Sequence, residues 1–342
     1  MNDFRTSEFR VIATGLEYPE GPVYQSDGSI LLVEIHKGTL TRVSPNGSTQ
    51  TVADFGVNPA DPGQPRLACG PNGAAVGPDG AIYVCNDGGM DYIQIPAIPN
   101  KTLPLLVPMT QPANYITGSI QRVANDGTIT TLYTQCNGNR LCSPDDLVFD
   151  AKGNFWFTDW GKLRLTDRDI TAVYHASPDG STITQAIPRR SAPNGIALSP
   201  KDKRLYVAET YARWIVYWEL DSSGAIVPNE KTLDHSYLLT AAIPGCGTLD
   251  SMAVDEEGNV YVATMLPKGL DPTVPGGITV ISPKGDILDF IELTVEGMPE
   301  PLPSNLCFGG PDRRTAYITL AGTGRLVSCE MKIPGKQLHF AK

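Results

Sequence analysis

The chain contains 342 residues, among them 34 glycines and 29 prolines, and its formal net charge of −10 gives an isoelectric point near 4.9. No cluster of Lys or Arg accompanies this acidity, which excludes nucleic acids and anionic membrane surfaces as partners because both are bound through basic patches. No apolar run approaches the ~18 residues of a membrane span, and residues 1–8 lack the charged-then-apolar pattern of a secretion signal.

Seven cysteines, an odd number, favour a reducing compartment, so we expect a cytoplasmic protein with free thiols. Cys136 and Cys142 flank five residues, and a disulfide that closes this small loop is the alternative. The glycines and prolines are spread along the chain as short turn signals, a distribution typical of many short strands.

The most informative feature of the chain is one phrase that occurs six times. Each copy has a polar first residue, a short apolar alternation, a Pro/Asp/Gly turn and a strand of β-branched and aromatic residues, which predicts a β-hairpin. The copies begin at Glu20, Asn72, Asp145, Asn194, Asp250 and Asn305. Four of the five steps between them span 49 to 56 residues, close to the ~40–50 residues of a four-stranded propeller blade.

A second strand pair follows the phrase, as in residues 39–43 with 49–53 and residues 119–123 with 128–132. The remaining step is 73 residues long and holds an insertion at about 90–118, rich in Pro and Ile, which we expect to cover one face. The sequence therefore predicts an all-β fold in which residues 1–342 form one six-bladed β-propeller domain. A β-sandwich is the alternative, but it does not explain six equivalent copies.

The first residues of the six copies all carry a side-chain oxygen at the same phase of the repeat. In a propeller, equivalent positions at the axial end of the inner strands converge on the central channel, so we expect a ring of oxygens there. Glu20, Asp145 and Asp250 are carboxylates that repel one another unless they are protonated or neutralised by a cation. Oxygen ligands without sulfur or imidazole favour Ca²⁺, Mg²⁺ or Mn²⁺. The alternative, that Asn and Asp are ordinary turn residues, explains single positions better than six.

The stretches around these residues resemble the gluconolactonase, senescence-marker-protein and luciferin-regenerating-enzyme-like family. The resemblance covers nearly the whole chain and is carried by residues 20–22, 143–150, 193–199, 249–255 and 304–312. It implies a six-bladed propeller with a divalent cation at its centre and, in most members, a lactone hydrolase.

Carried over residue by residue, the resemblance implies that Glu20, Asn194 and Asp250 bind the metal, and that Asp250 is also the catalytic acid/base. Asp145 departs from the family pattern, which commonly has Asn there, and we expect it to contact metal or substrate and include it as a fourth ligand. Calcium is the first candidate, with magnesium, manganese or zinc as alternatives. Some sugar-lactone members carry an arginine where Ser143 stands, which argues against a simple sugar lactone as the small-molecule substrate.

The substrate pocket should be formed by loops at the face where the ring lies. These loops follow the second strands of the hairpins or belong to the insertion. The predicted substrate-binding residues are His36, Asn72, Asn86, Tyr115, Trp160 and Met265. For the aromatic residues and the methionine, packing in the core is the alternative.

The functional hypothesis is a metal-dependent hydrolase that opens a lactone. The cation would polarise the ester carbonyl while Asp250 accepts a proton from the attacking water. A lyase, hydratase, isomerase or phosphotriesterase on the same cation site is one alternative, and a non-enzymatic propeller scaffold is another. The sequence leaves the oligomeric state open.

Overall fold

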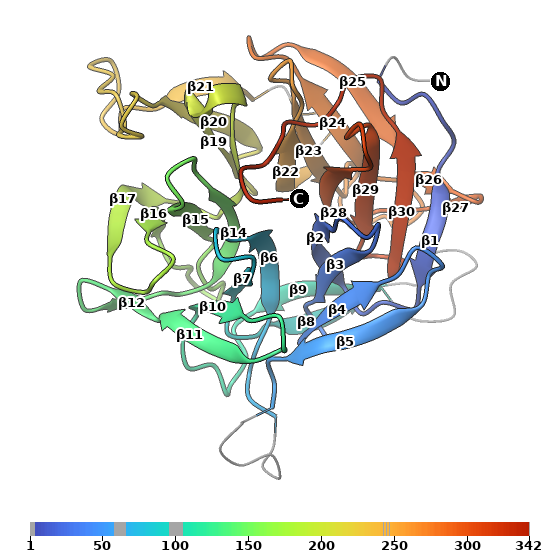
Figure 1. The fold of residues 1–342 in the computed structure, drawn as a ribbon, viewed down its shortest axis with the longest axis horizontal. Coiled ribbons are helices and arrows are strands. Elements are labelled where there is room, and N and C mark those ends of the chain that lie inside the picture. Colours follow the sequence, from blue (N-terminus) through green and yellow to red (C-terminus); the bar gives the residue numbers. More distant parts are fainter. Residues whose placement is uncertain are drawn as a thin grey trace.

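The computed structural model describes residues 4–57, 66–95, 105–241, 243, 245 and 247–341. Within these residues six four-stranded antiparallel sheets stand around a central axis (Figure 1), and the helical content is the 3₁₀ turn η1 (Pro200–Asp202). The predicted six-bladed β-propeller is therefore confirmed. Nothing helical in the described part of the chain is long and apolar enough to cross a membrane.

In every blade the first strand of the phrase lies innermost. Blade 1 consists of β2 (Pro19–Tyr24), β3 (Ile30–Glu34), β4 (Thr39–Val43) and β5 (Thr49–Asp54). Blade 2 consists of β6 (Pro71–Val76), β7 (Ile82–Asn86), β10 (Ser119–Val123) and β11 (Ile129–Tyr133). Blade 3 consists of β14 (Pro144–Phe149), β15 (Phe155–Asp159), β16 (Thr171–Ala176) and β17 (Ile183–Arg190).

The last blade closes the ring with a strand from the other end of the chain. Blade 4 consists of β18 (Pro193–Leu198), β19 (Arg204–Glu209), β20 (Trp214–Glu219) and β21 (Tyr237–Thr240). Blade 5 consists of β22 (Thr248–Val254), β23 (Val260–Met265), β24 (Gly277–Ile281) and β25 (Ile287–Glu292). Blade 6 consists of β28 (Pro303–Gly309), β29 (Thr315–Leu320), β30 (Arg325–Glu330) and β1 (Arg10–Thr14). Because β1 pairs with β30, the first strand of the chain fastens its last blade, a closure that the sequence did not predict.

Apolar side chains fill the spaces between neighbouring blades. Between blades 2 and 3, the rings of Tyr83, Phe149 and Phe155 pack with centroids 5.1 to 5.8 Å apart. Between blades 3 and 4, the fully buried Trp218 lies among branched aliphatic side chains. Burial of this apolar surface holds the inner strands at fixed positions around the axis.

Each inner strand is bulged beside the residue that opens its phrase. The pairing register shifts between Glu20 and Val23 in β2, and it shifts at the equivalent place in β6, β14, β18, β22 and β28. A bulge bends a strand and turns a side chain away from the regular alternation. Beside two of these bulges, a Cβ atom added to Gly73 or Gly195 would lie within 2.7 Å of the carbonyl oxygen of Asp145 or Asp250, so the glycines allow the inner strands to approach closely.

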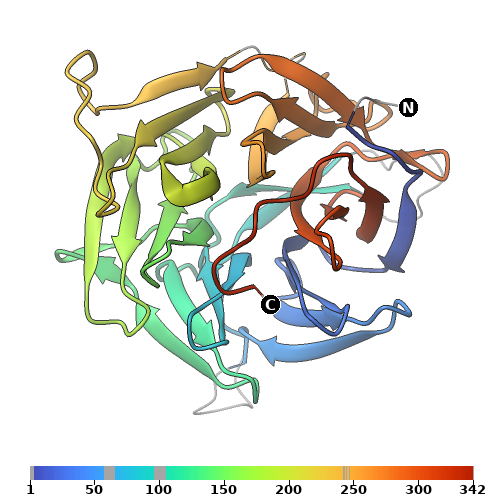
Figure 2. The ribbon, with the colours of Figure 1, turned by 45° about the horizontal axis from the view of Figure 1, so that its top comes forward.

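The two ends of the central channel are covered by different segments. At the upstream ends of the inner strands lies the hairpin of β8 (Asp91–Ile95) and β9 (Leu105–Thr110), which belongs to the predicted insertion; its tip lies outside the described residues. At the downstream ends, residues 333–341 cross the axis as a C-terminal strap (Figures 1 and 2). Short hairpins are formed by β12 (Gln135–Cys136) with β13 (Asn139–Arg140), and by β26 (Thr294–Val295) with β27 (Met298–Pro299).

The thiols of Cys136 and Cys142 are both free in the structure. Cys136 is buried at the end of β12, and Cys142 follows β13 and is partly buried. The expectation of free thiols is met at this pair, and the alternative of a disulfide-closed loop is not adopted.

Candidate metal centre

The six residues that open the phrases lie together at the axis, one from each inner strand. All six are buried, with exposed fractions from 1% for Glu20 to 9% for Asp250. In ring order carboxylates and amides alternate: Glu20, Asn72, Asp145, Asn194, Asp250 and Asn305. The structure therefore brings together the four predicted metal ligands, with Asn72 and Asn305 between them.

Two amides of this ring donate a hydrogen bond to the carboxylate of the next blade. Asn72 Nδ2 donates to Asp145 Oδ2 over 3.3 Å, and Asn305 Nδ2 donates to Glu20 Oε2 over 2.8 Å. The third amide, Asn194, lies beside Asp250 of the next blade and acts to lower the pKa of that carboxyl. Each carboxylate of the ring thus has an amide from the preceding blade as its neighbour.

Burial and mutual repulsion raise the pKa values of the carboxyl groups at the axis. Burial, followed by the charges of Asp250 and Asp146, raises the pKa of Glu20 well above its usual value. Burial, followed by the charges of Asp250 and Glu20, raises the pKa of Asp145 in the same way. Burial raises the pKa of Asp250 to about 7, although its hydrogen bond with Asn194 acts in the opposite direction. Buried carboxylates that repel one another need either protons or a cation.

Three oxygens of the predicted ligand set are buried and have no hydrogen-bond partner: Glu20 Oε1, Asp145 Oδ1 and Asn194 Oδ1. Leaving such atoms unpaired is costly, so three around one axis indicate that a further group belongs there. In the described residues, no group of three or more His, Cys, Asp or Glu side chains is arranged to hold a metal ion as it stands. Glu20, Asp145 and Asp250 do not form such a group by themselves, because an amide lies between each pair, so a ligand set at the axis has to include Asn194. Its oxygens fit a hard divalent cation better than a metal that prefers sulfur or nitrogen.

Two of the predicted substrate-binding residues lie beside the insertion hairpin. The half-exposed side chain of His36 places Nδ1 2.9 Å from Glu17 Oε2, and its ring meets the edge of Tyr92 with centroids 5.0 Å apart. Met265, at the end of β23, packs in an apolar cluster that also contains Tyr92 and the buried Leu105 of β9. This cluster joins the hairpin to blades 1, 5 and 6 over the ring end of the channel.

Two others, Trp160 and Tyr115, lie in or beside the loop that follows β15 of blade 3. Trp160 is buried, and its Nε1 donates to Thr210 Oγ1 over 3.1 Å while the guanidinium of Arg168 lies 4.8 Å from its ring centroid. The Tyr115 hydroxyl donates to the backbone oxygen of Cys142 over 2.6 Å. The Lys162 ammonium lies 5.3 Å from the centre of the Tyr115 ring.

The two predicted asparagines differ in their surroundings. Asn72 belongs to the ring itself through its bond to Asp145. The Asn86 amide is used within its own blade: its oxygen accepts from the N–H groups of Gly70 and Gly88, and its nitrogen donates to Gln121. Asn86 therefore fastens the loop that follows β7.

Tyr18 and Asp146 also lie at the ring, and sequence reasoning did not assign them to the site. Tyr18 is buried in the left-handed region at φ +58°, which is uncommon for a bulky residue. Burial, then the charge of Asp250, raises its pKa well above its usual value. Asp146 accepts hydrogen bonds from the N–H groups of Leu147 and Ile196, and burial raises its pKa to about 7. Their closeness in sequence to Glu20 and Asp145 was the available signal.

A six-bladed propeller with an oxygen-lined axis is the arrangement that the sequence resemblance implied. Residues 18–322 match the family described as the SMP-30/gluconolactonase/LRE-like region, and the chain belongs to this family. A gluconolactonase of Zymomonas mobilis is 28% identical over 327 residues, which cover 89% of this chain and 76% of that protein. These findings indicate a lactone-hydrolysing enzyme.

Solved structures share the same fold. A gluconolactonase from Xanthomonas campestris superposes with a TM-score of 0.66 at 18% identity, over 97% of this chain and 95% of that one. Regucalcin from Agrobacterium tumefaciens, a calcium-binding protein, superposes with a TM-score of 0.64 at 15% identity, over 98% of this chain and all of that one (100%). At these identities the likeness establishes the fold alone.

Proposed function

We propose that the chain is a divalent-metal-dependent lactonase whose reaction takes place at the ring of Glu20, Asp145, Asn194 and Asp250. The observation that carries this proposal is the set of three buried, unpartnered ligand oxygens on the axis. Calcium is the proposed ion, because all donors are hard oxygens and because a calcium-binding protein shares the fold. When bound, the cation would polarise the ester carbonyl and favour the negative charge that develops on its oxygen.

The chain's own groups would orient the reactants and move the proton. Asp250 would accept a proton at its carboxylate from the water that attacks the carbonyl carbon, and would return it to the leaving alkoxide oxygen of the opened ring. The amide of Asn194, which lies beside Asp250, would help to hold the direction of that carboxylate. The insertion hairpin and the apolar cluster that contains Tyr18 and Leu105 would keep bulk water away from the ring.

The proposed substrate is a lactone other than a simple sugar lactone. A sugar lactone presents several hydroxyl groups, and each needs a hydrogen-bond partner when it is buried. The cluster beside the ring instead contains Tyr18, Ile35, Leu105, Leu302 and Met265, which offer mostly apolar surface. These contacts favour a lactone that carries an apolar substituent.

The proposal is tested by hydrolysis of a panel of lactones. The release of acid in weakly buffered solution measures the rate. δ-Gluconolactone serves as the sugar probe, and dihydrocoumarin with alkyl-substituted γ- and δ-lactones as the apolar probes. We expect turnover of the apolar probes, loss of activity after chelation, and recovery on addition of Ca²⁺. Activity that survives complete chelation, or the absence of turnover with every lactone, would overturn the proposal.

A further inference from the structure

A cavity of about 460 Å³ lies in the central channel, on the side of the ring opposite the insertion hairpin. Asp146 and Asn305 line its inner end, and residues 336–341 of the C-terminal strap line its outer end. Its volume falls within the range of ~300–1,000 Å³ that is usual for small-molecule sites. The reaction proposed at the ring does not use this space.

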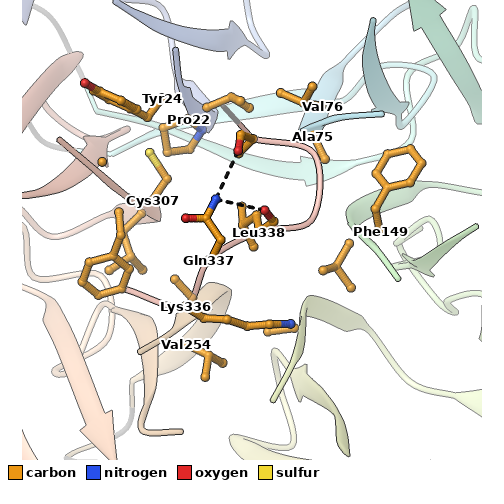
Figure 3. A pocket seen from close by; sticks show the side chains of 18 of the residues that line it. Pro22, Tyr24, Ala75, Val76, Phe149, Val254, Cys307, Lys336, Gln337 and Leu338 are labelled. Carbon is orange, nitrogen blue, oxygen red and sulfur yellow. Dashed lines mark hydrogen bonds between the residues drawn. The ribbon is translucent and has the colours of Figure 1, made fainter. Parts of the chain in front are cut away.

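The walls of the cavity are mainly apolar and come from the inner strands of all six blades. Figure 3 shows Ala75 and Val76 of β6, Phe149 of β14, Val254 of β22 and Cys307 of β28 around the space. Water in such a space finds few hydrogen-bond partners, whereas an apolar molecule gains contacts with the walls. The walls therefore favour an apolar occupant.

The charged and polar groups at the ends of the cavity already have partners. Lys336 Nζ donates to Asp202 Oδ1 over 2.8 Å, and His339 Nε2 lies 2.6 Å from Asp202 Oδ2. At the inner end, Asp146 accepts two backbone N–H groups, from Leu147 and Ile196. With these charges paired, the cavity offers no free partner for a charged ligand.

The strap is fastened to the blades and folded on itself, so it covers the cavity as a built part of the fold. The backbone N–H of Lys336 donates to Val254, and Arg313 Nη1 donates to Gln337 Oε1 over 3.0 Å. Gln337 Nε2 in turn donates to the carbonyl groups of Leu338 and Ala341, each over 3.2 Å (Figure 3). The ring of Phe340 meets the edge of Phe149 with centroids 5.7 Å apart.

We propose that this axial cavity is a second binding site, for an uncharged and mainly apolar small molecule. Its volume is about three times that of a 150 Å³ apolar cavity that holds benzene, so a ligand of two or three rings, or an alkyl chain of similar bulk, fits. The site is distinct from the proposed metal centre, because it contains none of the four proposed metal ligands and meets the ring only at Asp146 and Asn305.

Titration of the full chain with 1-N-phenylnaphthylamine, an uncharged three-ring fluorophore, tests the proposal. We expect saturable binding of one probe per chain with increased fluorescence. Ala75→Phe places a ring in the cavity and should weaken binding at least ~10-fold, since the filled volume removes the ligand's contacts. Ala225→Phe adds the same ring on an exposed turn of blade 4 and should leave binding unchanged.

Cys307→Phe, on β28, fills the cavity from another blade and decides the question if Ala75→Phe does not fold. Thermal unfolding of each variant shows which of them retain the native fold. Absence of saturable binding to the wild-type chain would overturn the proposal. Equal binding to the wild type and to a folded, cavity-filled variant would place the probe elsewhere and would overturn it as well.

Discussion

Asn305 Nδ2 donates a 2.8 Å hydrogen bond to Glu20 Oε2 and so joins the innermost strands of the last blade and the first. Both side chains are buried, and 285 residues separate them in the chain. The bond thus lies where the propeller closes, and like the bond from Asn72 to Asp145 it supports a carboxylate while leaving one carboxylate oxygen without a partner. Ring closure and the candidate metal centre therefore depend on the same contact.

Asn305→Asp should make the chain's stability depend on a divalent cation. The variant replaces a donor with a fourth carboxylate beside Glu20, so we expect the cation-free protein to lose about 1–3 kcal/mol of unfolding free energy. Urea unfolding in chelator and in Ca²⁺ measures this, and Ca²⁺ should restore part of the loss. Asn46→Asp, on an exposed turn, is the matched control. Equal losses with and without Ca²⁺ would contradict the expected coupling.

Asp250→Asn should abolish lactone turnover while the fold is retained. The amide cannot accept the proton from water, and loss of a general base typically lowers kcat by ~10²–10⁴-fold. Initial rates measure the effect, and circular dichroism checks the fold. Asp221→Asn, whose side chain caps an exposed turn, should leave the rate unchanged. An active Asp250→Asn enzyme would remove Asp250 from the base role.

Lys162→Met should destabilise the chain strongly, although it lies outside the ring. The fully buried Lys162 ammonium lies 3.6 Å from Asp87 Oδ1 and donates to the carbonyl of Gly89 at the base of the insertion hairpin. Burial lowers the pKa of Lys162, and the charge of Asp87 opposes this effect. Removing one partner of a buried pair costs about 3–5 kcal/mol because the other charge stays buried.

Urea unfolding of the wild type, Lys162→Met, Lys231→Met and the double variant separates the effect of the lost charge from the effect of changing the side-chain packing. Lys231→Met, at an exposed position, should be close to neutral. Adding Asp87→Asn to Lys162→Met should recover much of the loss, because it removes the largest of the carboxylate charges that act on Lys162, and the next, Asp159, keeps its backbone hydrogen bonds. A double variant that is less stable than Lys162→Met would show that the pair does not act through its charge.

Asp150→Asn should lower stability in a pH-dependent way. Burial favours the neutral form of Asp150, but its 2.9 Å contact with His175 and the N–H of Lys152 outweigh this and lower its pKa. A lowered carboxyl pKa stabilises the fold fully above the unfolded-state value of ~3.9, and this contribution disappears as the pH falls through the folded-state value. We expect a difference of about 1 kcal/mol at pH 6 that shrinks as the pH falls below the unfolded-state value, measured by urea unfolding. A difference that grows below pH 4 would contradict this assignment.

The repeat made the architecture and the ring predictable from sequence. Glu20, Asp145 and Asp250 occupy the same position in their copies of the repeat. Each copy is recognisable from its own turn residues, so aligning the copies was enough to place the three residues on equivalent strands. The bulges that turn these side chains toward the axis could not be predicted, because they depend on pairing geometry. The pairing of each amide with the next carboxylate likewise follows from how the blades are spaced.

Segments outside the repeat were harder to predict. β1 completes a blade whose other strands lie about 300 residues later, and the strap around Lys336 is held by Asp202 of another blade. Neither segment has a sequence pattern that indicates which strand or loop it contacts. The predicted substrate-binding residues fall into two groups for a similar reason. Trp160 follows β15 and Met265 ends the equivalent strand β23, yet of these two only Met265 packs in the cluster with the insertion hairpin.

Diffraction from crystals grown with Mn²⁺, with data collected at its absorption edge, tests the central claim most directly. We expect one strong anomalous peak on the propeller axis, within bonding distance of oxygens from Glu20, Asp145, Asn194 and Asp250. An axis without a peak, in crystals that bind the ion elsewhere or not at all, would contradict it.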